Sequence, residues 1–245
     1  MTLEHSRNVS GQSRRRQYVA RVWNRDYFPV RHVGRFVDAH LQQFVSSGSA
    51  VLDVGCGNQP FLEKIARLGG RYVGVDIERS SAPTGDLVLG TITALPFRDA
   101  SFDVVVCSEV LEHVWDTTTA FVELKRVTRP GGWILVTVPF VYPLHEEPYD
   151  FVRLTPYSIQ RHAAAHRLEV EKLERAGNEG EAIAVLLDRW VLRSLSATPS
   201  LPLRVLAAGI RLIANIAALL VGGGPAPTEP VAFVSIRAVL RRADR

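Results

Sequence analysis

The sequence predicts an α/β fold built on a doubly wound, mostly parallel sheet. Apolar runs of strand length alternate with helix-like segments from about residue 50 to residue 175, as in strand–helix–strand units. A chain of 245 residues with 47% hydrophobic content can enclose the core of one such domain. Strands are expected near residues 50–54, 71–76, 86–89, 102–107, 132–138, 168–174 and 230–240, and helices before residue 47 and near residues 60–69, 117–128 and 155–165.

The first expected strand ends in a glycine-containing turn. Residues 51–54 form an apolar run that is broken only by Asp53 and is followed by Gly55 and Gly57. Glycine has no Cβ, so the backbone can turn tightly there and approach a ligand closely. The next strand ends in Asp76, where an acidic residue accepts hydrogen bonds from a ribose in strand–turn–helix nucleotide sites. The spacing predicts a cofactor that contains adenosine.

A dinucleotide and S-adenosyl-L-methionine both contain adenosine, and the third glycine position distinguishes them. Dinucleotide sites use G-x-G-x-x-G, whose last glycine allows close helix packing beside the pyrophosphate. This sequence has Pro60 in that position, and proline has no backbone N–H to donate to a phosphate. S-adenosyl-L-methionine is therefore the favoured cofactor.

Further motifs follow in a fixed order. Residues 95–103 read L-P-F-R-D-A-S-F-D, residues 110–114 read V-L-E-H-V, and residues 129–132 read R-P-G-G. With D-x-G-x-G and the acid after the second strand, they resemble the class I S-adenosylmethionine-dependent methyltransferases. The resemblance covers residues 50–138 closely and the strands that follow more loosely. It implies a Rossmann-like sheet with an antiparallel last strand, and V-L-E-H-V is most similar to small-molecule O-methyltransferases of the quinone-biosynthesis type.

The resemblance also assigns cofactor contacts near the glycine turn. Asp53 is expected to orient the turn and reach toward the cofactor amine, or only to cap local N–H groups. Gly55 and Gly57 are expected beneath the methionine portion, with Cys56 as a pocket-lining thiol. Asp76 is expected to accept hydrogen bonds from the ribose hydroxyls.

Contacts with the adenine and the sulfonium are expected from later segments. Ile77 is expected against the adenine face, and Thr91 and Ile92 stand where the family often has an acid that contacts the adenine amino group. Because Thr91 departs from that pattern, the contact is expected to be weaker or made by the backbone. Ser108 is expected to face the sulfonium. For Ile77, Ile92 and Ser108 a purely structural role is an equal alternative.

Two histidines are candidates for general base. Methyl transfer needs alignment of a nucleophile, and a hydroxyl acceptor also benefits from a base such as neutral histidine. His145 is preferred because it lies in the expected substrate loop after the fifth strand, with Asp150 and Arg153; His113 is the second choice. The H-E-x-P-x-D-x-x-R-x-T pattern of this loop resembles methyltransferases of cell-envelope biosynthesis, although the same residues could form a salt-bridged loop latch.

No metal is expected. The sequence has no Cys/His spacing for structural zinc. Glu109, Glu112 and His113 could in principle bind a cation, but the partner histidines of such a site are not evident in the sequence.

Charge argues against a nucleic-acid substrate. Residues 1–49 and 183–245 each carry eight arginines against three acidic residues, whereas the segment between them has 13 basic and 19 acidic residues. A nucleic-acid enzyme would carry its basic surface around the substrate cleft. The polar N-terminus, without a signal-peptide core, predicts a cytoplasmic location.

Four regions are expected along the chain. A basic arm with cap helices occupies residues 1–49, the cofactor-binding core residues 50–180, an apolar helical insertion residues 181–229, and the last strand with a basic tail residues 230–245. The apolar run of the insertion is shorter than the roughly 20 residues of a membrane span, and a single crossing would separate the last strand from its sheet. Contact with the inner face of a membrane or formation of a homodimer is favoured over intramolecular packing.

The sequence thus predicts a methyltransferase that acts on a small-molecule, lipid-linked or glycan-linked acceptor, at a hydroxyl. The alternative is a catalytically silent S-adenosylmethionine-binding scaffold.

Overall fold

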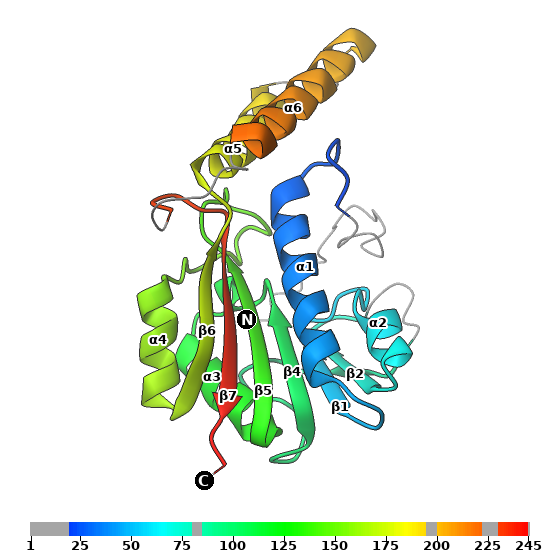
Figure 1. The fold of residues 1–245 in the computed structure, drawn as a ribbon, viewed down its shortest axis with the longest axis vertical. Coiled ribbons are helices and arrows are strands. Elements are labelled where there is room, and N and C mark those ends of the chain that lie inside the picture. Colours follow the sequence, from blue (N-terminus) through cyan, green and yellow to red (C-terminus); the bar gives the residue numbers. More distant parts are fainter. Residues whose placement is uncertain (1–19, 80–84, 195–199, 222–229, 245) are drawn as a thin grey trace, which may run out of the picture.

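The computed structural model describes residues 20–79, 85–194, 200–221 and 230–244 (Figure 1). One seven-stranded sheet runs through it in the order β3-β2-β1-β4-β5-β7-β6. Its strands are β1 (Ala50–Val54), β2 (Arg71–Asp76), β3 (Leu87–Leu89), β4 (Phe102–Ser108), β5 (Thr128–Pro139), β6 (Leu168–Ala176) and β7 (Ser235–Arg242). The helices are α1 (Tyr27–Phe44), α2 (Leu62–Arg67), the 3₁₀ turn η2 (Leu111–His113), α3 (Thr117–Val127), α4 (Pro156–Ala165), α5 (Glu179–Ser194) and α6 (Leu201–Val221).

The sheet is parallel except at its last strand. β7 lies between β5 and β6 and is antiparallel to both, which confirms the expected α/β architecture. Strand β7 begins five residues later than the expected start at Pro230, and β5 begins earlier than expected because the R-P-G-G segment is part of the strand. The carboxyl ends of β1, β2, β4 and β5 therefore share one edge, as ligand sites in such sheets require.

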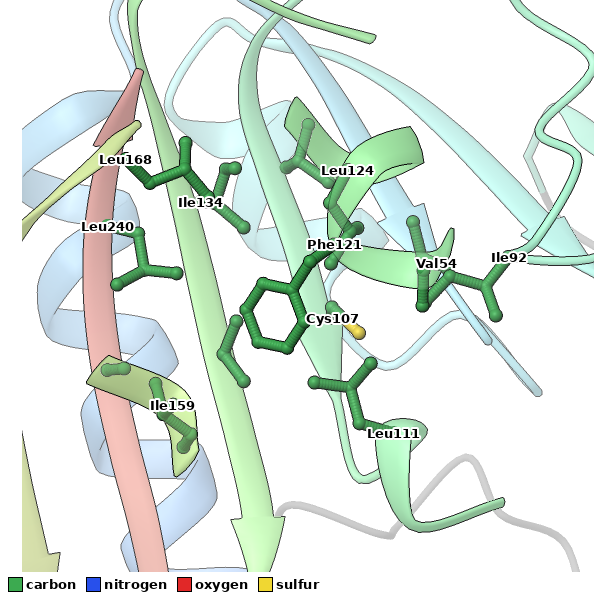
Figure 2. Packing of buried hydrophobic residues seen from close by; sticks show 14 of the residues in the cluster. Val54, Ile92, Cys107, Leu111, Phe121, Leu124, Ile134, Ile159, Leu168 and Leu240 are labelled. Atoms are coloured by element: carbon green, nitrogen blue, oxygen red, sulfur yellow. The ribbon is translucent and has the colours of Figure 1, made fainter. Parts of the chain in front are cut away.

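Apolar side chains bury both faces of the sheet. Residues of α1 and α2, including Val37 and Ile65, pack on one face, and residues of α3 and α4 pack on the other. Figure 2 shows this second core, where Phe121 of α3 points at Cys107 of β4. Strand residues alternate between the two clusters, as the period of two along a strand requires.

Polar caps fix where the helices nearest the site begin. Asp116 accepts a hydrogen bond of 2.9 Å from the Thr119 backbone N–H before α3. Thr155 and Ser158 form a reciprocal capping box at the start of α4, which satisfies two backbone donors that the helix leaves unpaired. The second cap anchors the far end of the loop that connects β5 to α4.

Helices α5 and α6 form a hairpin beyond the carboxyl edge of the sheet (Figure 1). Its base packs on the start of α1 through Phe28, Val185 and Ala218, and Glu181 pairs with Arg31 and His32 of α1. The insertion between β6 and β7 is thus helical. Before residue 47 the described part of the chain has one α-helix, α1; Arg14, Arg15 and Arg16 of the basic arm lie outside the described residues.

Candidate functional site

The glycine turn after β1 comes within contact distance of the segment after β4. Gly55 and Gly57 have φ angles of +67° and +49°, which glycine adopts without strain. A Cβ on Gly55 would lie 2.3 Å from Cγ2 of Val110, so only glycine fits there. The turn expected to pass beneath the cofactor therefore lies directly against the segment that contains Glu109 and Glu112.

Asp76 ends β2 and holds the glycine turn. One carboxylate oxygen accepts a hydrogen bond of 2.8 Å from the Gly57 backbone N–H, and the other accepts one of 3.2 Å from Glu78 N–H. A carboxylate has about four acceptor sites, so lone pairs remain for the two hydroxyls of a ribose. Asp76 thus supports the turn and is available to the cofactor.

Asp53 lies in the middle of β1 and is 2% exposed. Its carboxyl accepts a hydrogen bond of 2.9 Å from the Tyr72 hydroxyl. Burial raises the pKa of Asp53 to about 7, and the charge of Asp76 adds to the rise against the opposing effect of the Tyr72 hydrogen bond. The cationic amine of a cofactor would supply the missing positive partner of this acid.

Cys56 is a free, buried thiol under the same turn. Its sulfur packs on β2 beside Gly74, where a Cβ would meet it at 2.7 Å. Burial raises the pKa of Cys56 to about 12, so the thiol is neutral and contributes packing to the floor of the turn.

The other expected cofactor residues divide between open and buried positions. Ile77 is 56% exposed at the end of β2, as an adenine contact requires. Thr91 is exposed and its hydroxyl lies 3.1 Å from that of Thr93. Ile92 is buried beside Val54 in the core (Figure 2), so its side chain packs inward. Ser108 is buried with its hydroxyl 2.9 Å from that of Thr137.

Two acids lie beyond β4, beside the glycine turn. Glu109 has a φ of +54° and one carboxylate oxygen without a hydrogen-bond partner. Glu112, in η2, is 1% exposed, and neither of its carboxylate oxygens has a hydrogen-bond partner. Burial raises the pKa of both acids, and repulsion from Glu112 raises that of Glu109 further.

The loop between β5 and α4 brings His145 to these acids. Asp150 has a side chain that is 1% exposed. It forms an ion pair with Arg153, whose Nη2 donates a hydrogen bond of 2.7 Å to Oδ2 of Asp150. Burial alone would raise the pKa of Asp150, but the hydrogen bonds from Arg153 lower it to about 2. The same carboxylate accepts from the His145 backbone N–H at 3.1 Å and lies 3.0 Å from His145 Nδ1, in a contact that is not aligned as a hydrogen bond. Asp150 and Arg153 thus form a loop latch that carries His145.

His113 and His145 meet at Glu112. Their rings lie edge to face with centroids 4.8 Å apart. Nε2 of His113 is 3.7 Å and Nε2 of His145 is 3.8 Å from Oε1 of Glu112. The two histidines chosen as alternative bases are therefore neighbours in one cluster, which we call the Glu112 cluster (Glu109, Glu112, His113 and His145).

Tyr72 could not be given a role in the site from the sequence, and Glu112 was considered only as a cation ligand that lacked an evident partner histidine. The sequence does contain a pattern that could have identified Glu112: E-x-x-E-H at residues 109–113 follows β4, and His145 follows β5, the neighbouring strand. His145 was singled out only as a base, so the two segments were not combined. The Tyr72–Asp53 hydrogen bond depends on the register that pairs Asp53 with Gly74 and has no sequence signature.

Comparisons with known proteins agree on this part of the chain. Residues 52–136 match the methyltransferase domain family. The chain is 36% identical over 142 residues to a probable S-adenosylmethionine-dependent methyltransferase of Mycolicibacterium smegmatis, covering 55% of this chain and 54% of that protein. It is 32% identical over 118 residues to a ubiquinone biosynthesis O-methyltransferase of Paraburkholderia phymatum, covering 43% of this chain and 49% of that protein.

One solved structure has a fold similar to that of this chain over most of its length. The 1,6-didemethyltoxoflavin-N1-methyltransferase of Burkholderia thailandensis, with bound S-adenosylhomocysteine, superposes with a TM-score of 0.53 at 14% identity, covering 87% of this chain and 78% of that one. The chain spans about half the length of the curated relatives it matches. The matched segment contains the glycine turn, Asp76 and the Glu112 cluster except His145.

Proposed function

We propose that this chain, which belongs to the class I S-adenosylmethionine-dependent methyltransferases, transfers a methyl group to a hydroxyl of a small-molecule, lipid-linked or glycan-linked acceptor. The observation that carries the proposal is the contact between the glycine turn and the segment of the Glu112 cluster at Gly55 and Val110. Cofactor and acceptor groups would thereby meet at one edge of the sheet.

The residues of the glycine turn fit S-adenosylmethionine. Asp53 is a buried acid with no cationic partner among the described residues, which suits the ammonium of the methionine portion. Asp76 has lone pairs for the ribose, and Ile77 offers an open apolar surface for the adenine. The bound cofactor supplies a methyl group on a sulfonium, which is already an activated electrophile.

The Glu112 cluster suits a hydroxyl acceptor. The backbone carbonyl of Tyr149 lies 2.9 Å from Nδ1 of His113, and Asp150 lies 3.0 Å from Nδ1 of His145. Each contact favours the proton on Nδ1, which leaves Nε2 as the basic nitrogen. Without a bound ion, His145 Nε2 would accept the proton of the acceptor hydroxyl. The O-methyltransferase activity named for the relative from Paraburkholderia phymatum supports the same acceptor chemistry.

Turnover and cofactor affinity should respond differently to loss of the histidine. General-base assistance typically contributes about 10²–10⁴-fold. We expect His145→Ala to lower turnover by that order, and His113→Ala by less, with S-adenosylmethionine affinity nearly unchanged. Formation of S-adenosylhomocysteine on extracts of quinones, lipids and glycans measures the first quantity, and calorimetry measures the second.

Near-normal turnover in both variants would mean that transfer relies on alignment alone, and the hydroxyl assignment would lose its mechanistic support. Cofactor binding by the wild type without turnover on any extract would favour the silent scaffold instead.

We also propose that the α5–α6 hairpin lies on the cytoplasmic face of an anionic membrane. The expectation that the apolar run is too short for a membrane span is wrong for α6: the helix is long and apolar enough to cross a membrane, with a mean hydropathy of 1.8 over Leu201–Leu220 and 17% of that stretch buried. Two of its polar residues face the protein: Arg211 pairs with Asp188, and Asn215 donates to the Val22 carbonyl at 2.7 Å, whereas Arg204 near its start is exposed.

The opposite side of α6 is apolar and exposed. Val205, Ile213 and Leu220 are 64%, 70% and 78% exposed. Trp23, with Arg21 over its ring at 5.8 Å, adds an aromatic and a basic group next to Val22, as interfacial proteins use at the headgroup level. A helix at a water-facing surface exposes its polar side chains and buries its apolar ones, whereas α6 exposes apolar side chains. A lipid surface would cover these side chains.

A further inference from the structure

We propose that the Glu112 cluster is a binding site for a divalent transition-metal cation, held by Glu112, His113 and His145. The three nearest ligand atoms, one from each of Glu112, His113 and His145, all lie within 4.8 Å of one another. They come from η2 and from the β5–α4 loop, two segments that the sheet brings together at its carboxyl edge.

The spacing within the cluster is that of ligands around a common ion. The Nε2 atoms of His113 and His145 are 3.7 and 3.8 Å from Oε1 of Glu112, which is too long for hydrogen bonds. Nitrogen and oxygen ligands each about 2.1 Å from one cation stand roughly 3–4 Å apart. The two separations from Glu112 therefore fit a shared ion, whereas the widest separation in the cluster, up to 4.8 Å, would shorten when the ion binds.

The burial of Glu112 calls for a positive partner. The residue is 1% exposed and both carboxylate oxygens lack a hydrogen-bond partner, although buried polar groups are nearly always paired. Arg153, the guanidinium that acts on it electrostatically, is engaged with Asp150. The remaining positive partners within reach are His113 and His145, at 3.7 and 3.8 Å. A buried carboxylate without hydrogen bonds costs several kcal/mol, and a cation shared with these histidines would offset that cost.

The outer contacts of both histidines aim Nε2 at the same point. Nδ1 of His113 faces the Tyr149 carbonyl at 2.9 Å, and Nδ1 of His145 faces Asp150 at 3.0 Å. Ligating histidines usually donate their second ring N–H to a carbonyl or a carboxylate, which fixes the tautomer and the ring direction. Nδ1 of His113 is placed for such a bond, whereas Nδ1 of His145 is close to Asp150 without hydrogen-bond alignment. The Asp150–Arg153 ion pair would thus position His145 as a ligand of the cation.

The donor set narrows the identity of the cation. Mixed imidazole and carboxylate donors suit Mn²⁺, Fe²⁺ or Zn²⁺, whereas Mg²⁺ and Ca²⁺ prefer oxygen alone. The role of the ion in transfer rests on the proposed function: an acceptor hydroxyl would bind it as a further ligand, become more acidic, and lose its proton to solvent water. His145 would then act as a ligand in place of the base.

Manganese binding tests the site without any acceptor. We would treat the full chain with a chelator, desalt it, and titrate it with MnCl₂ while following the electron paramagnetic resonance signal of free Mn²⁺, with ZnCl₂ as competitor. We expect one site per chain. Altering only an outer partner of a ligand typically costs 10–100-fold in metal affinity, so Glu112→Gln and His145→Gln should each weaken binding at least about tenfold.

Two matched substitutions serve as controls. Glu171→Gln on β6 removes a carboxylate and His166→Gln after α4 removes an imidazole, both at positions outside the cluster. Both variants should bind Mn²⁺ with the affinity of the wild type. Circular dichroism and S-adenosylmethionine affinity show whether each variant is folded. Failure of the wild type to bind Mn²⁺ or Zn²⁺ at millimolar concentration, or equal affinity in Glu112→Gln and the wild type, would overturn the proposal. Neither outcome bears on cofactor binding, so failure of the metal site and failure of the methyltransferase assignment are distinguishable.

Discussion

Asp53 combines a cost in stability with a place in the proposed cofactor site. The folded protein buries its carboxyl, and burial raises the pKa from 3.8 to about 7. Between about pH 4 and pH 7 the folded state retains a proton that the unfolded chain has lost. Stability therefore falls as the pH rises through this window. A cofactor amine would reverse the effect by stabilising the ionised acid.

Asp53→Asn should remove this pH dependence. The amide oxygen can still accept from Tyr72, but it does not ionise. Between pH 5 and pH 8 the stability of the variant relative to the wild type should increase by about 3 kcal/mol, since the change corresponds to about two pKa units, each worth roughly 1.4 kcal/mol. Urea unfolding of both proteins at the two pH values is the measurement, and an equal difference at both would contradict this account of Asp53.

Individual residues could be predicted where chemistry follows from local sequence. The turn at Gly55 and Gly57 was identifiable because two glycines follow an apolar strand. Ribose binding by Asp76, which rests on an acid at the end of the next strand, stays a prediction. The buried state of Glu112 was not predictable, since it depends on the loop between β5 and α4 covering η2. The direction of the Ile92 side chain was not predictable either. Its position in the chain suggested a contact with adenine, but the side chain packs beside Val54 in the core.

At the scale of elements, α6 shows why sequence and structure can suggest opposite surfaces. Arg204, Arg211 and Asn215 share one helical face by spacing, and in water such a face would be exposed. In the structure Arg211 and Asn215 turn inward, through the ion pair with Asp188 and the hydrogen bond to Val22, whereas Arg204 is exposed. The spacing of these residues indicates a shared face but not its direction, because the partners come from α5 and from Val22.

Liposome flotation tests the exposed side of α6. Wild type should float with vesicles that contain anionic lipid and less with neutral ones. A variant with Val205, Ile213 and Leu220 changed to Ser should lose flotation, because these side chains supply the buried apolar area. Val122, Tyr157 and Val170, which are exposed on α3, α4 and β6, give a control triple variant that should float normally.

Light scattering on the same proteins separates membrane contact from self-association. If the wild type does not float but is a dimer that the α6 variant converts to a monomer, the apolar side binds a second copy and the membrane proposal is wrong.

At the scale of the whole molecule, the sheet gathers the functional parts at one edge. The glycine turn follows the carboxyl end of β1, and the Glu112 cluster follows those of β4 and β5; the hairpin lies beyond the same edge of the sheet (Figure 1). Tyr142, in the loop that carries His145, contacts both Asp26 and Arg189, so this loop and the hairpin are joined directly. A lipid-linked acceptor could therefore reach the cluster from a membrane-bound hairpin.

The overall architecture was predictable because alternating strands and helices admit few arrangements. The packing of the hairpin and the meeting of Glu112 with His145 were not, because each depends on contacts between segments about 30 or more residues apart.

The central claim is that the edge formed by β1 and β2 binds S-adenosylmethionine, and calorimetric titration tests it most directly. Wild type and Asp76→Ala would each be titrated with S-adenosylmethionine and with NAD, with Glu78→Ala as the neighbouring control. Asp76→Ala should weaken S-adenosylmethionine binding by roughly 1.5–3 kcal/mol, the value of hydrogen bonds to a charged group, while Glu78→Ala should bind like the wild type. Unchanged affinity in Asp76→Ala, or tighter binding of NAD than of S-adenosylmethionine by the wild type, would contradict the account.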